Sequence, residues 1–131
     1  MNGASVMETS GALTPLQHML YEGRASRKIL SLLFEYGADL HALDYHGKTT
    51  IQVCIEHSEG MLLQLISLGA DVNQRNSDGL CPLHVAVAAG NKNIVWTLLQ
   101  NGADPDILTE DGHHCRDLTE DEDILRLFEA I

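Results

Sequence analysis

The chain has 131 residues, of which 44% are hydrophobic, which is enough for one compact domain. Its net charge is −11 with only eight lysines and arginines, so we expect no basic surface that would hold nucleic acid or anionic lipid. No apolar stretch approaches the ~20 residues that cross a membrane, and three widely spaced cysteines favour reduced thiols.

The sequence repeats itself. The tripeptide Gly-Ala-Asp and a second series of turn glycines both recur in steps of 32 and 33 residues. Such a period marks one supersecondary unit that buries its apolar face only against a neighbouring copy. The turn glycines are Gly37, Gly47, Gly69, Gly79, Gly102 and Gly112. We expect a flexible N-terminal lead over 1–10 and a single domain over 11–131, with repeats over about 11–43, 44–75 and 76–108 and a C-terminal cap over 109–131.

The first copy begins with Thr14-Pro15-Leu16, typical of a first helical turn because proline needs no N–H there. Its turn, from Gly23 to Ile29, is longer than that of the third copy. The second copy starts with Thr49-Thr50-Ile51-Gln52, which lacks proline, and its turn at Ser58-Glu59-Gly60 is one residue short. We expect the first helix of this copy to be clipped or irregular.

The third copy, Asp78 to Ile107, has the clearest pattern. Pro82 precedes apolar residues at helical spacing, and a turn at Gly90-Asn91 leads to a second apolar stripe. Gly102 is expected to end that helix in the left-handed conformation, which glycine adopts at little cost. Each copy is therefore predicted to be two short helices and a loop that reaches the next copy.

The last copy begins at Gly112 and runs through Glu120-Asp121-Glu122-Asp123 into an aliphatic stretch. Carboxylates at a helix N-terminus are favoured by the helix dipole, so we expect a terminal capping helix. Its acidic outer face should oppose end-to-end association, and we expect the chain by itself to be a monomer.

The segment Cys81-Pro82-Leu83-His84-Val85-Ala86 resembles the ankyrin repeat, whose motif at this place is Thr-Pro-Leu-His-x-Ala, and Asn101-Gly102-Ala103-Asp104 completes the copy. The resemblance covers about residues 13 to 131. It implies an all-α fold, an ankyrin-repeat solenoid of stacked helix-turn-helix units with loop or β-turn fingers. It also implies that His84 makes local, structural hydrogen bonds.

In ankyrin stacks, the loop tips beside the turn glycine and the ends of the first helices line a concave binding surface. Carried over by position, the resemblance selects as protein-binding residues Tyr45, His46, Lys48, Glu56, His57, Ser77, Asp78, Leu80, Glu110, Asp111 and His113, with Tyr21, Glu22, Ala88 and Ala89 beside them. Tyrosine and histidine are suited to anchor an interface, and the carboxylates favour a protein partner with a basic surface. Alternatively, these tips are polar only because they are solvated.

Leu63 and Trp96 share one position of the repeat, where the second helix turns towards solvent. They predict a second contact patch on the convex side. The alternative is that the tryptophan lies over the adjacent helix as additional packing.

No catalytic set is evident. A linear stack presents an open surface without the water-excluding cleft that a triad needs, so we expect neither an enzyme nor a cofactor. Cys115 beside His113 and His114 suggests a metal site, but the ligand spacing of zinc sites is absent. We assign no metal ligand and keep a histidine and cysteine metal-binding protein as an alternative.

The expected function is that of a non-enzymatic protein-interaction module, a regulatory adaptor or scaffold inside the cell, in the cytoplasm, the nucleus or both. A narrower alternative is a small inhibitor that occludes a kinase or a transcription factor. Ankyrin inhibitors of cyclin-dependent kinases are similarly small and acidic, and Ile51-Gln52-Val53 is similar to a stretch in them. Small IκB-like ankyrin proteins are the other comparison.

Overall fold

The structure of the protein is a computed structural model that describes residues 14–23 and 26–130. The predicted lead over residues 1–10 lies outside the described residues. Throughout the described part the chain is helical without strands, and no helix there is long and apolar enough to cross a membrane. The elements in chain order are α1 (Pro15–Tyr21), α2 (Arg27–Glu35), α3 (Thr50–His57), the 3-10 helix η1 (Glu59–Met61), α4 (Leu62–Ser67), α5 (Pro82–Ala89), α6 (Lys92–Gln100), the 3-10 helix η2 (Cys115–Leu118) and α7 (Glu122–Glu129).

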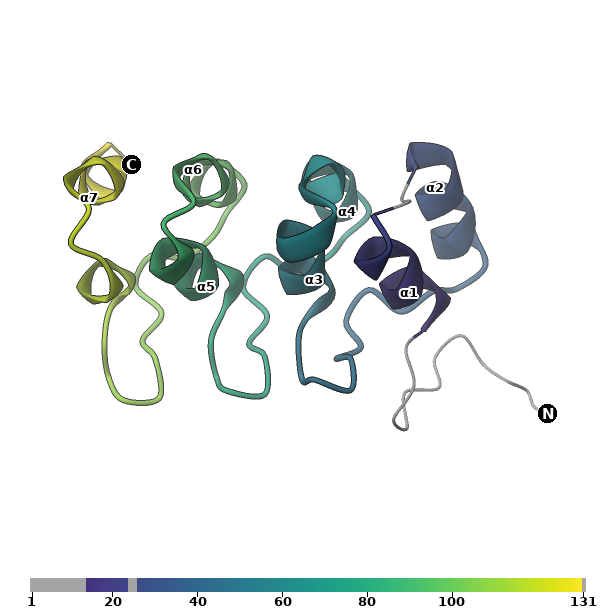
Figure 1. Ribbon diagram of the computed structural model, residues 1–131, viewed down its shortest axis with the longest axis horizontal. Coiled ribbons are helices and arrows are strands. Elements are labelled where there is room, and N and C mark those ends of the chain that lie inside the picture. Colours follow the sequence, from purple (N-terminus) through teal and green to yellow (C-terminus); the bar gives the residue numbers. More distant parts are fainter. Residues whose placement is uncertain (1–13, 24–25, 131) are drawn as a thin grey trace. The chain divides into compact units, whose positions relative to one another are not determined.

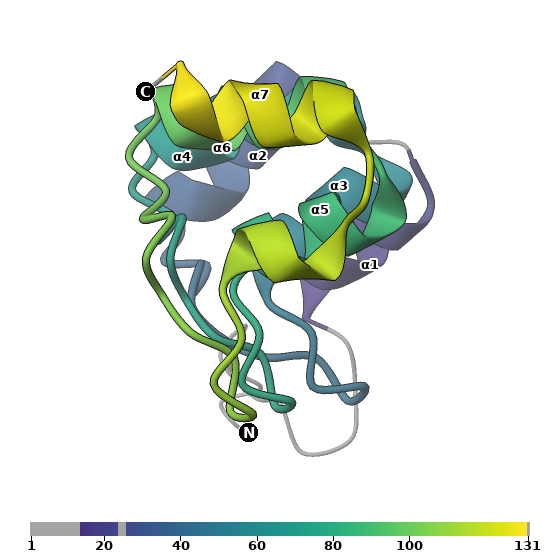
Figure 2. The same cartoon turned by 90° about the vertical axis from the view of Figure 1, so that its left-hand side faces the viewer.

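The chain divides after Asp71 into two compact units, which we call unit 1 and unit 2. In unit 1, α1 packs against α2 and α3, and α3 packs against α4 (Figure 1). In unit 2, α5 packs against α6 and η2, and α6 lies beside α7 (Figures 1 and 2). Each unit is thus built from helix pairs laid side by side, with the first helix of one pair against the first helix of the next.

The first helices begin where the sequence predicts them. Pro15 and Pro82 are the first residues of α1 and α5. The Thr14 hydroxyl accepts a hydrogen bond of 3.1 Å from the backbone N–H of Gln17, and the Gln17 side chain accepts one of 2.9 Å from the N–H of Thr14. This reciprocal capping box satisfies donors that a helix start otherwise leaves unpaired.

The prediction of a clipped first helix in the second copy was wrong. α3 is regular, and its residues 50–55 are all buried. The short turn is absorbed after Ser58 instead, where η1 leads into the six-residue α4. Packing of a whole buried helix outweighs the missing proline, since tertiary contacts supply most helical stability in proteins. The Ser58 hydroxyl also donates a 2.8 Å hydrogen bond to the carbonyl of Leu20 in α1.

Each unit buries its own leucines. Leu20, Leu30 and Leu65 are fully buried in unit 1, as are Leu83 and Leu98 in unit 2. The six turn glycines predicted from the sequence have φ values from 76° to 107°, a left-handed region that other residues enter only with strain. The loops that these glycines close carry the predicted contact residues.

Candidate interaction surface

The loop tip over residues 44–48 in unit 1 is closed by a buried carboxylate. Asp44 Oδ1 accepts hydrogen bonds from the backbone N–H groups of His46 and Lys48, at 2.8 and 2.9 Å. The N–H of Asp44 donates to the carbonyl of Lys48 over 3.0 Å. Only 6% of Asp44 is exposed, so the tip backbone is fixed from below while its side chains face outwards.

The tips over 76–80 and 109–113 in unit 2 repeat this construction. Asn76 Oδ1 accepts hydrogen bonds from the N–H groups of Asp78 and Leu80, at 2.8 and 3.1 Å. The Thr109 hydroxyl accepts one of 3.0 Å from the N–H of His113. These closing residues were missing from the predicted set, although a signal was present: each stands three positions before a turn glycine and keeps the steps of 32 and 33 residues.

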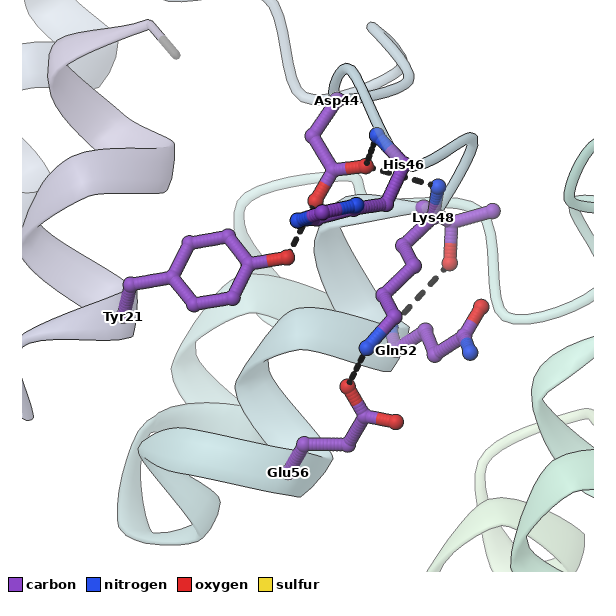
Figure 3. A network of polar contacts seen from close by, with 7 residues as sticks. Tyr21, Asp44, His46, Lys48, Gln52 and Glu56 are labelled. Carbon is purple, nitrogen blue, oxygen red and sulfur yellow. Dashed lines mark hydrogen bonds and ion pairs between the residues drawn. The ribbon is translucent and has the colours of Figure 1, made fainter.

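Tyr21, at the end of α1, points at the closing carboxylate of the neighbouring tip (Figure 3). Its hydroxyl donates a 2.5 Å hydrogen bond to Asp44 Oδ2, and its ring centroid lies 4.7 Å from that of His57. Burial and the hydrogen bond to Asp44 both raise the pKa of Tyr21 above its usual value. The phenol therefore stays protonated and links α1 to the tip.

Lys48 and Glu56 join the same tip to α3 (Figure 3). The Lys48 ammonium lies 2.6 Å from Glu56 Oε1, and both side chains are half-buried. A pair this exposed contributes only about 0.2–1 kcal/mol to stability. Its main effect is to hold both side chains in one orientation on the surface.

Arg75 and Glu110 connect the two tips of unit 2. The Arg75 Nη1 group donates hydrogen bonds to the carbonyls of Gly79 and Leu108, at 2.5 and 2.9 Å. The Glu110 side chain lies directly against Gly79, because a Cβ added there would sit 2.2 Å from Glu110 Oε1. The φ of 77° favours a glycine at position 79, and a Cβ there would also displace the exposed Glu110 side chain.

The structure brings the predicted contact residues together within each unit. In unit 1, Tyr45, His46 and Lys48 stand on the tip, with the Tyr45 and His46 rings 4.0 Å apart, while Glu56 and His57 end α3. In unit 2 the exposed members are Ser77, Asp78, Glu110, Asp111 and His113, and Leu80 is half-buried. For the predicted convex patch, Leu63 in unit 1 and Trp96 in unit 2 are each exposed.

His84 is fully buried and holds α5 to the loop that follows. Its Nδ1 accepts a 3.1 Å hydrogen bond from the N–H of Cys81, which leaves the proton on Nε2, and Nε2 donates to the carbonyl of Ile107 over 2.8 Å. A hydrogen bond between the buried thiols of Cys81 and Cys115 lowers the pKa of Cys81. Among the described residues, no three histidine, cysteine or carboxylate side chains converge as a metal site.

Comparison with known proteins identifies the family. The Ankyrin repeat family profile matches residues 78–110. Over 83 residues the chain is 41% identical to the mouse B-cell lymphoma 3 protein homolog, covering 60% of this chain and 18% of that protein. It is 33% identical over 107 residues to mouse NF-kappa-B inhibitor zeta, covering 76% of this chain and 13% of that protein.

A solved structure shows the same architecture. The crystal structure of the ankyrin repeat domain of Bcl-3, a unique member of the IkappaB protein family, superposes with a TM-score of 0.81 at 26% identity. It covers 89% of this chain and 51% of that chain, whereas this chain spans less than a fifth of the two curated relatives named above. The repeat period, the paired helices and these matches together establish that the chain belongs to the ankyrin-repeat family.

Proposed function

We propose that this chain is a non-enzymatic interaction module that binds a protein partner with its loop tips and the ends of its first helices. The observation that carries the proposal is that exposed tip side chains stand on backbone already fixed by Asp44 and Asn76. A surface that is ordered before binding loses little conformational entropy on binding. Affinity can then come from a few anchors, of which Tyr45 is the largest exposed side chain at the unit 1 tip.

The charge of the unit 2 tips indicates the chemistry of the partner. Asp78, Glu110 and Asp111 are exposed, and none of them forms an ion pair with another described residue. In a chain of net charge −11 these carboxylates favour a basic protein segment and disfavour nucleic acid or an anionic membrane. Complementary charge of this kind mainly raises the association rate and the salt dependence of binding.

Affinity purification with matched variants tests the proposal. Tyr45→Ala with Lys48→Ala should remove the specific partners that the wild-type chain captures, and Asp78→Asn with Glu110→Gln should weaken their capture most at low salt. Glu122→Gln with Glu129→Gln, which removes two exposed carboxylates on α7, serves as the control of equal charge change for the second variant. Capture that is unaltered in both tip variants, with folding verified by circular dichroism, would refute the use of this surface.

A second candidate function is an IκB-like inhibitor that occludes a transcription factor in the cytoplasm or nucleus. The names of two relatives, NF-kappa-B inhibitor zeta and Bcl-3 as an IkappaB family member, favour it over the cyclin-dependent-kinase-inhibitor-like version. Calorimetric titration of the chain with purified NF-κB, with a cyclin-dependent kinase as comparison, tests it directly. Tight binding to the kinase alone would reverse the preference.

A further inference from the structure

The second helix of unit 1 carries an apolar stripe on its outer side. Ile29, Leu32, Leu33 and Tyr36 stand at positions i, i+3, i+4 and i+7, which places them on one face of α2. Ile29 is 47% exposed, Leu32 42% and Tyr36, which caps the helix, 80%. We call these four residues the α2 stripe. It lies apart from the loop tips assigned to the proposed function.

Two of these four positions are part of the core in unit 2, while those of Leu32 and Tyr36 hold the half-buried Thr97 and the exposed Asn101. Ile94 and Leu98 stand in α6 where Ile29 and Leu33 stand in α2, relative to the turn glycines Gly102 and Gly37. Ile94 is 3% exposed and Leu98 is fully buried. Ile29 and Leu33 therefore stand at packing positions of the repeat, and the described part of unit 1 leaves Ile29 uncovered. Exposed apolar patches of this kind mark interaction sites in soluble proteins.

A terminal repeat that faces only solvent is built differently. α7 turns Glu122, Arg126 and Glu129 outwards and buries Ile124 and Phe128. This is the polar outer face that a capping repeat requires for solubility. α2 has the opposite character, so its outer face is not that of a cap.

The charges beside the stripe indicate what covers it. Arg27 and Lys28 open α2, both are exposed, and neither forms an ion pair with a described residue. In a chain with a net charge of −11, uncompensated cations at one end of an apolar stripe favour an occupant that carries carboxylates there.

The size of the stripe limits the kind of occupant. The nine residues of α2 span about 14 Å, or two to three turns. One helix face of this length buries a few hundred Å², well below the roughly 800 Å² per partner of a stable protein–protein interface. A short amphipathic helix laid along the stripe matches this length, and it needs far less area than a second copy of the chain.

We propose that the α2 stripe, with Arg27 and Lys28, binds a short amphipathic helix of a partner protein. The partner helix presents aliphatic side chains to Ile29 and Leu32 and carboxylates to the two cations. This binding does not involve the loop tips, so the experiment below can refute it without refuting the proposed function, and the reverse.

The test uses a fluorescein-labelled peptide with the sequence of residues 119–131, which is acidic at its start and aliphatic afterwards. Fluorescence anisotropy with the full-length chain should give a Kd of about 10–100 µM. Leu32→Glu should weaken binding about tenfold or more, and Lys28→Glu about fivefold. A peptide with lysine at positions 120–123 should not bind.

Leu108→Glu serves as the control, because Leu108 is an exposed leucine of unit 2 outside the stripe and its replacement should leave peptide binding unchanged. Equal binding to the wild-type chain and Leu32→Glu overturns the proposal. So does absence of binding to the wild-type chain, the result expected if its own residues 1–13 occupy the stripe. Sedimentation that shows a dimer abolished by Leu32→Glu would name a second copy as occupant and would also overturn it.

Discussion

Ile29 and Ile94 stand at one position of the repeat, eight residues before the turn glycines Gly37 and Gly102. In unit 2 Ile94 is 3% exposed, while in unit 1 Ile29 is 47% exposed. The residue type, its place in the helix and the helix length of nine residues are the same in both. The repeat pattern therefore determines which face of the helix is apolar. The elements that pack against that face determine whether it is buried.

In the loop tips of the two units, by contrast, different residue types at one repeat position form the same hydrogen bonds. Asp44 in unit 1 and Asn76 in unit 2 each offer one side-chain oxygen to two backbone N–H groups. Asp44 has a second oxygen, which Tyr21 uses to bind the tip to α1. A charged closing residue therefore connects the tip to a neighbouring helix as well as shaping it.

The largest expected difference comes from truncating the two isoleucines. Ile94→Ala should lower the free energy of unfolding by about 2–4 kcal/mol, because it removes buried methyl groups and leaves a cavity. Ile29→Ala should cost less than about 1 kcal/mol, since that side chain is half exposed. Urea denaturation followed by circular dichroism measures both. Equal losses would mean that unit 1 covers Ile29 in solution.

Removal of the closing side chain should have the next largest effect. Asp44→Ala leaves the N–H groups of His46 and Lys48 and the Tyr21 hydroxyl without their acceptor, at a cost of about 2–3 kcal/mol. Asp44→Asn reproduces the arrangement of Asn76 and should cost about 1 kcal/mol or less. Thermal denaturation compares them, and an Asn variant as unstable as the Ala variant would contradict the shared construction.

Two turn glycines of unit 2 allow a smaller, matched test. Gly79→Ala and Gly112→Ala should each cost about 1–2 kcal/mol, because both positions have positive φ. Only the Gly79 change also displaces a side chain, that of Glu110, since no described atom lies within 4 Å of a Cβ at Gly112. Amide NMR shifts over 109–113 should therefore move in the Gly79 variant. Unmoved Glu110 resonances there would show that this contact is absent in solution.

The smallest expected effect has the opposite sign. Thr50 is the first residue of α3, where α1 and α5 have Pro15 and Pro82, and its buried hydroxyl has no hydrogen-bond partner among the described residues. Thr50→Pro should stabilise unit 1 by about 0.4–1 kcal/mol, because Thr49 already has the extended conformation that precedes proline. Thr14→Ala, which removes a cap, provides a destabilising reference. A lowered melting temperature for Thr50→Pro would show that position 50 does not accept proline as the first residue of α3.

Much of the candidate surface could be predicted from spacing alone. The turn glycines, the prolines at helix starts and the acidic start of α7 act locally, so one sequence suffices to place them. The capping-box role of Gln17 was not visible, because the residue departs from the histidine of the motif. Gln17 nevertheless bonds Thr14 and the carbonyl of Ala42, as His84 bonds Cys81 and the carbonyl of Ile107.

The sequence by itself determined the period of the repeat, the helix pairs and the loops that carry polar side chains, because turn and capping chemistry depends on neighbours in the chain. Only the tertiary structure decided that α3 is a complete helix, that Tyr21 reaches Asp44 across 23 positions, and that Ile29 is open while Ile94 is buried. These outcomes depend on which helices pack together, and a pattern that repeats along the chain is the same whether or not its packing face is covered.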